Sequence, residues 1–404
     1  MTQLQQNGYG TATTPFFSVP ANLATGVNFV VPGQNDGSCP EDTTWTRDPM
    51  APAANTTPTE GVAPFGSSAG RNYLAAENNA TSTGPNANPA NPPQTTAAGT
   101  DNNCVNVARS SGAPRTSTTG DKLTFQYYAF AMDAVSWAST SVKSPATLTQ
   151  AQLSAIYDCT TTDWSQVGGT AGTIQRYFPQ PGSGTRAFFI SDILGKPSSY
   201  TPPAASTVPG CPSDAKLIEE NEGQQIARVD IDKAILPYSA GVWSNQESNR
   251  INPTLDKRVG ALLKGITTAS PQPVIQGTPI QWIGSNNDYE LDTSATGVVK
   301  ETNVKLNVVA PATVNYPGIR YVFNVMDSGG NAGGFAAAKS LFGFNNVSGG
   351  TKSPLCDNQN SGNPLSVLAL NLLQSNSFAS LDATTNIGGN NAAGATCRFF
   401  APAS

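Results

Sequence analysis

The stretch Gln180-Pro181-Gly182-Ser183-Gly184-Thr185-Arg186-Ala187-Phe188-Phe189 joins a Gly-Ser-Gly-Thr turn to an apolar segment that we expect to be helical. Such a turn offers two hydroxyl groups and several backbone N–H groups at the start of the helix, where an anion is favoured. Arg186 adds a guanidinium that matches the oxygens of a tetrahedral oxyanion. Turns of this composition are also ordinary helix caps, so this segment alone leaves both interpretations open.

Two turns of similar composition lie upstream. Pro64-Phe65-Gly66-Ser67-Ser68-Ala69-Gly70 precedes a segment that begins like a helix. Val105-Asn106-Val107-Ala108-Arg109-Ser110-Ser111-Gly112 is a short apolar strand that ends in Arg-Ser-Ser-Gly. Hydroxyls and backbone N–H groups in such turns form concave anion-binding sites. Three turns of this type in one chain favour one shared anion as their ligand.

In this order, the three turns resemble those of the phosphate-binding proteins that serve ABC transporters and have the type II periplasmic-binding-protein fold. The resemblance spans about residues 64 to 400 and is greatest to the secreted proteins of Gram-positive bacteria. Further segments resemble the family in the expected order: Met132-Asp133-Ala134-Val135-Ser136-Trp137-Ala138, Leu148-Thr149-Gln150-Ala151-Gln152-Leu153-Ser154-Ala155-Ile156-Tyr157, Asp163-Trp164-Ser165-Gln166-Val167-Gly168-Gly169, Glu220-Asn221-Glu222-Gly223, Ala234-Ile235-Leu236-Pro237-Tyr238-Ser239 and Tyr316-Pro317-Gly318-Ile319-Arg320-Tyr321-Val322.

The resemblance implies an α/β protein of two lobes, of which the first is discontinuous. We expect residues 1–122 and 317–404 in lobe one and residues 123–316 in lobe two. Apolar stretches suit strands that cross between the lobes at 122–138 and 316–326. Residues 148–157 have apolar positions at helical spacing, with Thr149 as the expected N-cap. Residues 332–342 and 364–374 are also expected to be helical. Loops are expected at 78–99 and 196–213, which are rich in turn-forming and small polar residues.

The resemblance further implies that inorganic phosphate binds in the cleft between the lobes and is delivered to a membrane permease. An anion that bonds both walls of the cleft favours its closed form through its differential contacts. No cofactor, bound metal or catalytic turnover is expected. The expected ligand-binding residues are Ser67, Ser68, Arg109, Ser110 and Ser111 from lobe one, and Gly182, Ser183, Gly184, Thr185 and Arg186 from lobe two.

Two departures from the family pattern affect the ligand. In many phosphate-specific members, an aspartate in the second turn accepts the proton of hydrogen phosphate and repels sulfate. Here Arg109 is followed by Ser110 and Ser111, so selectivity would need Asp133 or another acid in the cleft. An arginine also commonly precedes the Gly-Ser-Gly-Thr turn by a few residues. Because Arg176 lies further back, we assign this guanidinium to Arg186, with a solvated side chain as the alternative.

Composition excludes several other functions. The chain of 404 residues contains no histidine, which excludes Ser-His-Asp catalysis, Cys-His catalysis and His-ligated zinc. A net charge of −5 argues against a basic surface for nucleic acid. The sequence contains no run of 18 apolar residues, so it predicts no membrane span. The pair Asp230 and Asp232 is expected on a solvated strand face, because no third metal ligand is evident nearby.

The six cysteines have no Cys-x-x-Cys spacing, which argues against zinc and thioredoxin chemistry. Sequence alone leaves all fifteen pairings open. With the lobes placed as the resemblance implies, sequential pairing is expected: Cys39–Cys104, Cys159–Cys211 and Cys356–Cys397. Each bridge would contribute about 4 kcal/mol by the chain-entropy estimate.

Oxidised cysteines and a charged fraction of only 12%, about half the usual share, are typical of an exported protein. We therefore expect an extracellular or cell-surface location. The first residues show no signal segment, so the numbering is expected to begin in a mature or trimmed chain. Three alternatives remain open at this point: a receptor for another oxyanion, an extracellular phosphate-ester hydrolase, and a filament or adhesion protein that retains the fold.

Overall fold

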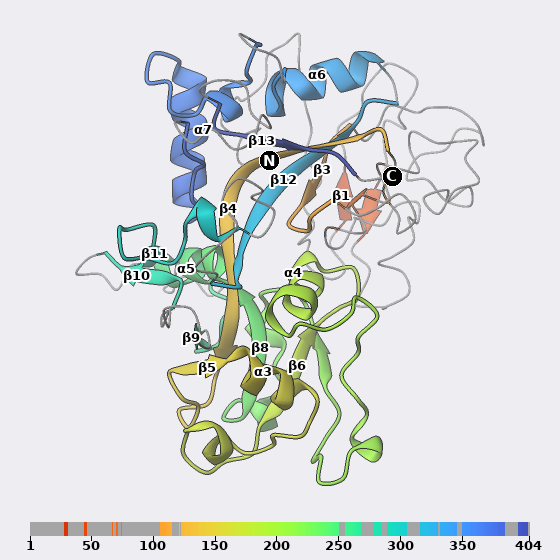
Figure 1. The fold of residues 1–404 in the computed structure, drawn as a ribbon, viewed down its shortest axis with the longest axis vertical. Coiled ribbons are helices and arrows are strands. Elements are labelled where there is room, and N and C mark those ends of the chain that lie inside the picture. Colours follow the sequence, from red (N-terminus) through yellow and green to blue (C-terminus); the bar gives the residue numbers. More distant parts are fainter. Residues whose placement is uncertain are drawn as a thin grey trace. The chain divides into compact units, whose positions relative to one another are not determined.

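The computed structural model describes residues 28–30, 44–46, 67, 70, 71, 74, 106–114, 121, 123–249, 255–267, 278–283, 289–304, 316–329, 332–345, 350–383 and 395–402. The chain divides into two compact units. Unit one comprises Met1–Ala131, Tyr321–Gln374 and Ser380–Ser404, and unit two comprises Met132–Arg320 and Ser375–Ala379. Strands β4 (Phe125–Ser139) and β12 (Ile319–Asp327) each contribute residues to both units (Figure 1). Both strands are long apolar runs, as the sequence predicts.

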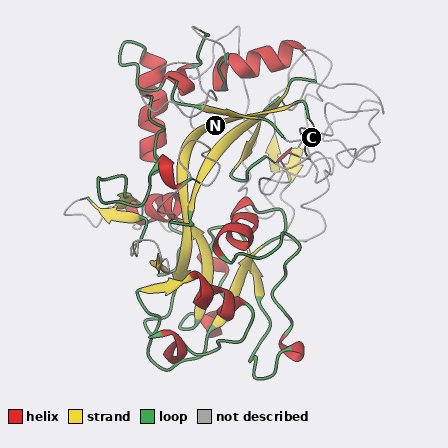
Figure 2. Cartoon of the chain, viewed as in Figure 1, coloured by secondary structure: helices red, strands yellow, loops and turns green. Residues whose placement is uncertain are grey.

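Unit one contains short antiparallel strand pairs and two longer helices. Strand β1 (Asn28–Val30) pairs with β2 (Thr44–Thr46), β3 (Ala108–Ser110) pairs with β12, and β13 (Arg398–Phe400) pairs with β4. The helices are α6 (Ala332–Phe342) and α7 (Pro364–Ser375), with a 3₁₀ turn at Pro354–Asp357 (Figure 2). Aromatic rings fill the space between β12, β4 and β13, where Phe323 contacts Tyr127 and Phe400 edge to face. The two helices therefore begin and end close to the bounds expected from the sequence.

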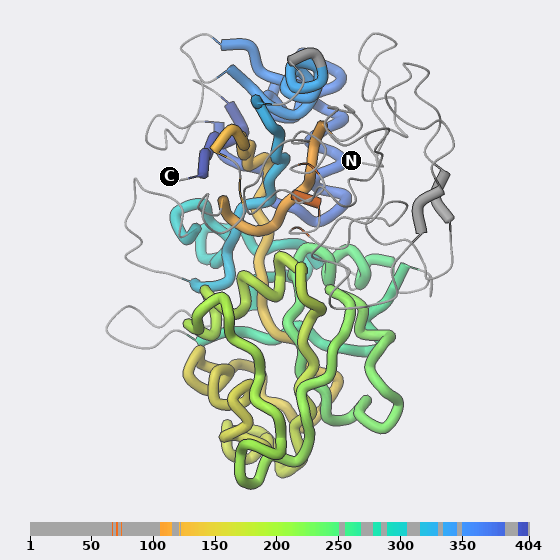
Figure 3. The backbone as a smooth tube through the Cα atoms, turned by 90° about the vertical axis from the view of Figure 1, so that its right-hand side faces the viewer, coloured from red at the N-terminus to blue at the C-terminus, as the bar shows by residue number. Residues whose placement is uncertain are grey.

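Unit two is built on a mixed sheet. Strand β4 pairs antiparallel with β8 (Ala234–Ser239) and β9 (Leu262–Thr267). Strand β6 (Gln175–Pro179) is parallel to β8 and to β7 (Lys216–Ile218), and β5 (Thr147–Thr149) is parallel to β9. All six residues of β8 are buried, as expected for a strand covered on both faces. Figure 3 traces residues 150–240 of this unit as a continuous yellow-to-green tube.

The remaining elements of unit two are short. Its α-helices are α3 (Gln150–Tyr157), α4 (Gly184–Phe188) and α5 (Ala240–Ser248), and one π-helical turn at Phe189–Ile193 continues α4. Its 3₁₀ turns are Trp164–Val167, Ala205–Thr207, Gly223–Gln225, Arg228–Asp230 and Glu301–Asn303. A hairpin of β10 (Ile280–Trp282) and β11 (Tyr289–Leu291) packs against α5, where Trp243 and Tyr289 meet edge to face at 5.5 Å.

Helix α3 begins where its sequence predicts. The Thr149 hydroxyl accepts a hydrogen bond from the Gln152 backbone N–H at 3.1 Å, and the Gln152 side-chain oxygen accepts one from the Thr149 N–H at 2.8 Å. This reciprocal capping box satisfies two backbone donors at the helix start. Leu153, Ile156 and Tyr157 form the buried face. The prediction of an N-cap at Thr149 is confirmed.

Unit two also includes Ser375–Ala379, whose chain neighbours on both sides belong to unit one. Met132 exchanges two backbone hydrogen bonds with Ala379, at 2.8 and 3.1 Å. The Ser377 carbonyl oxygen lies so close to Gly241 that a Cβ added there would approach it to 2.7 Å. Glycine is therefore required at the start of α5 for this segment to lie against it.

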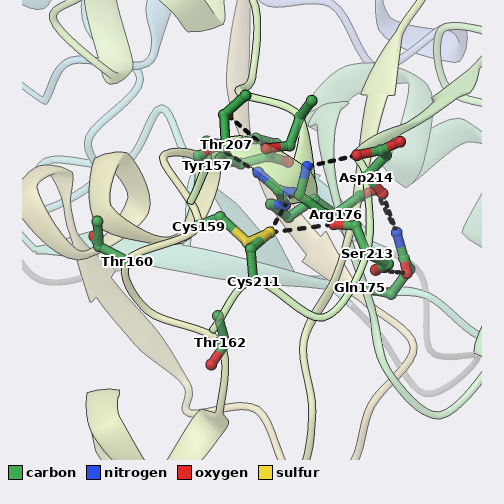
Figure 4. The surroundings of a disulfide bond; sticks show 12 residues. Tyr157, Cys159, Thr160, Thr162, Gln175, Arg176, Thr207, Cys211, Ser213 and Asp214 are labelled. Atoms are coloured by element: carbon green, nitrogen blue, oxygen red, sulfur yellow. Dashed lines mark hydrogen bonds between the residues drawn. A yellow bond between two sulfur atoms is a disulfide. The ribbon is translucent and has the colours of Figure 1, made fainter. Parts of the chain in front are cut away.

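Two of the expected disulfides are present, Cys159–Cys211 and Cys356–Cys397, with Cα–Cα distances of 5.5 and 4.9 Å. Figure 4 shows the Arg176 side chain beside the first of them. Its guanidinium donates to the Tyr157 carbonyl at 2.9 Å and to the Ser213 carbonyl at 2.7 Å. Arg176 thus ties the loop around Cys211 to α3. The expected pair Cys39–Cys104 lies outside the described residues, as does the loop expected at 78–99.

The expectation for Asp230 and Asp232 was wrong. Residues Arg228–Asp230 form a 3₁₀ turn and not a strand. Asp230 is buried, and its carboxylate accepts from the Tyr177 hydroxyl at 2.8 Å and from the Lys216 ammonium at 2.5 Å. Asp232 is exposed. The alternating pattern at residues 230–232 led to a wrong prediction because Asp230 is buried in a tertiary ion pair with Lys216 and does not lie on a strand face.

Candidate anion-binding site

The Gly-Ser-Gly-Thr turn follows β6, and an acidic segment follows the neighbouring strand. Because β6 and β7 are parallel and pair Pro179 with Ile218, the residues after both strands emerge at the same edge of the sheet. Gly182 has φ +88°, a left-handed conformation that favours glycine. Ser183 is the N-cap of α4, and its hydroxyl oxygen accepts from the Arg186 N–H at 3.0 Å.

The acidic segment places a carboxylate on this turn. The Ser183 hydroxyl donates to Glu220 Oε2, and the Thr185 hydroxyl donates to Glu220 Oε1 at 2.6 Å. The Thr185 backbone N–H points to Glu220 Oε2 at 3.5 Å. Ser183 and Thr185 are buried, whereas Glu220 is half-buried. The turn is therefore an assembled set of donors that holds a negatively charged group.

The Arg186 side chain folds back along β6. Its Nη1 donates to the Pro179 carbonyl at 2.7 Å, and its guanidinium lies 4.5 Å from the centre of the Phe178 ring. Burial lowers the pKa of Arg186 to about 10, which leaves the group charged at neutral pH. The contact with Phe178 is a cation–π interaction on a partly desolvated side chain. Arg186 thus lies beside the turn, and its Nη1 is held by the Pro179 carbonyl.

In unit one, the structure brings together Ser67 and Ser111, while the neighbouring Ser110 bonds to Gly112. The Ser67 hydroxyl accepts from the Ser111 N–H at 2.9 Å and lies 3.1 Å from the Ser111 hydroxyl. The Ser110 hydroxyl donates to the Gly112 carbonyl at 2.9 Å and accepts from its N–H at 3.1 Å. Arg109 is exposed, while Ala108 and Ser110 on either side of it are buried. Alternation along β3 therefore directs Arg109 and Ser110 to opposite faces of the strand.

A buried ionic group supports this serine cluster. Arg71 Nη1 donates to the Ala113 carbonyl and to the Tyr127 hydroxyl, both at 3.0 Å, and the Tyr127 hydroxyl donates to Asp121 at 2.6 Å. Burial raises the pKa of Tyr127 above its ordinary range, so the phenol stays neutral. The group fixes the chain immediately after Ser111. Ser68 lies outside the described residues.

A second buried carboxylate in unit two is Asp133. It accepts from Arg320 Nε at 3.1 Å and Nη2 at 2.7 Å, and from the Ser239 hydroxyl at 2.9 Å. It also accepts from the Gly241 N–H at 3.1 Å, at the beginning of α5. Arg320 Nη1 is buried and has no hydrogen-bond partner among the described residues. Asp133 thus joins Arg320 to the end of β8 and the beginning of α5.

The described residues contain no cluster of three acidic or cysteine side chains placed to hold a metal ion. In the same part of the chain, no helix combines the length and apolar character needed to cross a membrane.

A sequence model described as the PBP superfamily domain matches residues 44–302, which is more than half of the chain. The chain belongs to the PBP superfamily. This membership and the mixed α/β architecture confirm the expected type II periplasmic-binding-protein-like fold. No curated protein matches the sequence.

Among solved structures, the PBP-superfamily chain is similar to an ABC-type phosphate transport receptor from Vibrio cholerae, with 15% identity over 56% of this chain and 68% of the other, and a TM-score of 0.31. A human phosphate-binding apolipoprotein shares 14% identity over 82% and 88% of the two chains, with a TM-score of 0.44. A phosphate-binding protein from Stenotrophomonas maltophilia shares 12% identity over 81% and 85%, with a TM-score of 0.39. Likeness at this level carries no functional argument.

The sequence singled out the turn at Ser183 and Thr185 but missed the role of Glu220. A signal was present, because an acidic tetrapeptide at residues 220–223 follows one apolar strand and the glycine-rich turn follows another. In a parallel α/β sheet, segments that follow neighbouring strands share one edge. Which strands are neighbours was the missing information, because the pairing of β6 with β7 joins residues 39 positions apart.

Proposed function

We propose that this PBP-superfamily protein is an exported solute-binding protein that captures inorganic phosphate and delivers it to an ABC permease. The observation that carries the proposal is the carboxylate of Glu220 on the Gly-Ser-Gly-Thr turn. Ser183 and Thr185 present two buried hydroxyls and a backbone N–H to one negatively charged group. The same donors suit the oxygens of phosphate, which is also an anionic acceptor of several hydrogen bonds.

The proposed ligand residues fall into two sets. In unit two, Ser183 and Thr185 donate their hydroxyls, and Gly182 and Gly184 allow the backbone to approach the anion. Arg186 adds positive charge beside the turn. In unit one, the proposed donors are the Ser67, Ser68 and Ser111 hydroxyls, with Arg109 as the cation, whereas the Ser110 hydroxyl is proposed to hold the turn through Gly112.

Export and the absence of turnover belong to the same proposal. Two disulfides support an oxidising compartment, outside the cell or at its surface. The chain lacks histidine, and the proposed mechanism uses only hydrogen bonds and charge. Binding and release therefore need no covalent step.

A receptor for a different oxyanion is the second candidate function. One observation favours it: Arg109 is followed by two serines and no carboxylate, so this turn offers no carboxylate to accept the proton of hydrogen phosphate. Sulfate carries no proton at neutral pH and therefore needs no such carboxylate.

Titration calorimetry tests the proposal on protein that has been freed of anions by partial unfolding and refolding. Orthophosphate and sulfate are titrated in parallel into the intact chain. We expect tight binding of phosphate, weakened about tenfold by Ser183→Ala because one charge-assisted hydrogen bond is lost. Thr207→Ala is the matched control, since it removes an exposed hydroxyl of the same unit. Equal heats for both anions would favour the second candidate, and the absence of heat from folded protein would refute both.

A further inference from the structure

We infer that Glu220 is an internal competitor for the anion, whose carboxylate occupies the donors of the Gly-Ser-Gly-Thr turn until the ligand displaces it. The inference rests on the proposed function, since it concerns the same turn. Both Glu220 oxygens are engaged: Oε1 by the Thr185 hydroxyl at 2.6 Å, and Oε2 by the Ser183 hydroxyl. A side chain of this protein therefore has the position that an oxyanion needs.

Competition follows from the number of hydrogens available. A serine or threonine hydroxyl has one hydrogen to donate. Ser183 is 2% exposed and Thr185 is fully buried, so water does not share these groups. While both hydrogens are directed to Glu220, neither can be donated to phosphate. The ligand binds these hydroxyls only after the carboxylate has withdrawn.

In this structure, the Glu220 carboxylate can withdraw by a movement of its side chain alone. The Glu220 backbone N–H donates to Gln180 Oε1 at 3.1 Å, and this fixes the backbone beside the turn. Gln180 is buried, whereas Glu220 is half-buried and has access to solvent. Glu220 has three rotatable side-chain bonds, and its carboxylate is well hydrated when it is exposed. Rotation to solvent therefore frees the turn without unfolding it.

The tethered carboxylate also determines which class of ligand is accepted. A free monocarboxylate would offer the turn no interaction that Glu220 does not already offer, and Glu220 has the advantage of a high effective concentration. A tetrahedral dianion carries more charge and more acceptor oxygens, so it gains contacts that Glu220 cannot make. The internal competitor therefore excludes simple carboxylates and lowers the affinity for phosphate.

The alternative role for Glu220 predicts the opposite sign. If Glu220 accepted the proton of bound hydrogen phosphate, its removal would weaken phosphate binding and admit sulfate. Competition predicts that removal strengthens phosphate binding. The two roles are therefore separated by the direction of one measured change.

The experiment compares phosphate affinity by calorimetry in the wild-type chain, Glu220→Ala and Glu220→Gln. Asp232→Asn is the matched control, because it removes an exposed negative charge from the same unit away from the turn. We expect phosphate to bind about tenfold more tightly to both Glu220 variants, since two charge-assisted hydrogen bonds no longer need to be broken. Asp232→Asn retains the wild-type affinity. Thermal unfolding of each variant verifies that it is folded.

Acetate distinguishes direct occupancy from simple charge repulsion. In Glu220→Ala, acetate has access to the vacated position, so it is expected to weaken phosphate binding and raise the thermal midpoint. It has neither effect on the wild-type chain. Tighter phosphate binding without an acetate effect would assign the gain to charge alone and overturn the inference. Unchanged or weaker phosphate binding in both variants would also overturn it and leave the proposed function standing. Absence of phosphate binding by every variant would refute the proposed function and the inference together.

Discussion

The buried pair of Asp133 and Arg320 gives a sharp prediction about stability. Their side chains are only 1% and 3% exposed, and their shortest contact is 2.7 Å. Asp133→Asn removes the charge but retains the shape, so it leaves the Arg320 guanidinium buried without its counter-ion. Breaking a buried pair from one side costs about 3–5 kcal/mol. The amide that replaces the carboxylate also carries N–H donors. These donors would face the Ser239, Gly241 and Arg320 groups, which are donors themselves.

Urea unfolding followed by tryptophan fluorescence measures the cost, because Trp137, Trp164 and Trp243 are buried in the same unit. We expect Asp133→Asn to lower the free energy of unfolding of this unit by about 3–5 kcal/mol. Combining it with Arg320→Met removes both charges and is expected to cost less than the two single changes added together.

A half-buried pair, with far more solvent contact, provides the control. Lys196 and Asp158 meet at 2.6 Å with side chains 26% and 30% exposed. Lys196→Met is expected to cost less than about 1 kcal/mol, because solvent screens this pair. A loss below about 1 kcal/mol for Asp133→Asn, similar to the control, would refute the argument that burial determines the cost.

Three further predictions concern the fold. Burial raises the pKa of Tyr177 from 10.0 to about 12, so the stability from its neutral phenol is intact below pH 10 and is lost as the pH rises towards 12. The urea midpoint of Tyr177→Phe is therefore expected to fall less than that of the wild type over this range, and parallel curves would contradict this. Replacing Cys159 and Cys211 by alanine opens a loop of 52 residues and is expected to cost about 4 kcal/mol in the same urea assay. Thr149→Ala removes half of the capping box and is expected to cost about 1 kcal/mol, whereas the exposed substitution Thr160→Ala serves as its control.

Local patterns were sufficient for the elements that local contacts specify. Helix α3 could be predicted because Thr149 and Gln152 cap it within one turn, and the bounds of α6 (Ala332–Phe342) also agree with the expected helical segment. The apolar runs of β4 and β12 were equally clear. These features depend on neighbours in the chain, which the sequence shows directly.

The partners of the candidate site could not be predicted in the same way. The contact of Glu220 with Ser183 depends on the pairing of β6 with β7, and the contact of Asp133 with Arg320 joins residues 187 positions apart. Asp230 was misplaced for the same reason, since Tyr177 and Lys216 reach it across the fold. For Arg109 and the other proposed ligand residues, the sequence provides a hypothesis about an anion, which the calorimetric experiments test.

The short segment Ser375–Ala379 has a practical consequence for dissecting the molecule. Unit two cannot be excised as one uninterrupted stretch of chain, because a fragment covering 132–320 would lack the residues that hydrogen-bond to Met132 and lie against Gly241. Such a fragment would leave the Met132 backbone groups and the backbone at Gly241 without the segment that contacts them. Adding a synthetic peptide of residues 375–379, or grafting that sequence onto the end of the fragment, is therefore the route to an isolated unit that folds by complementation.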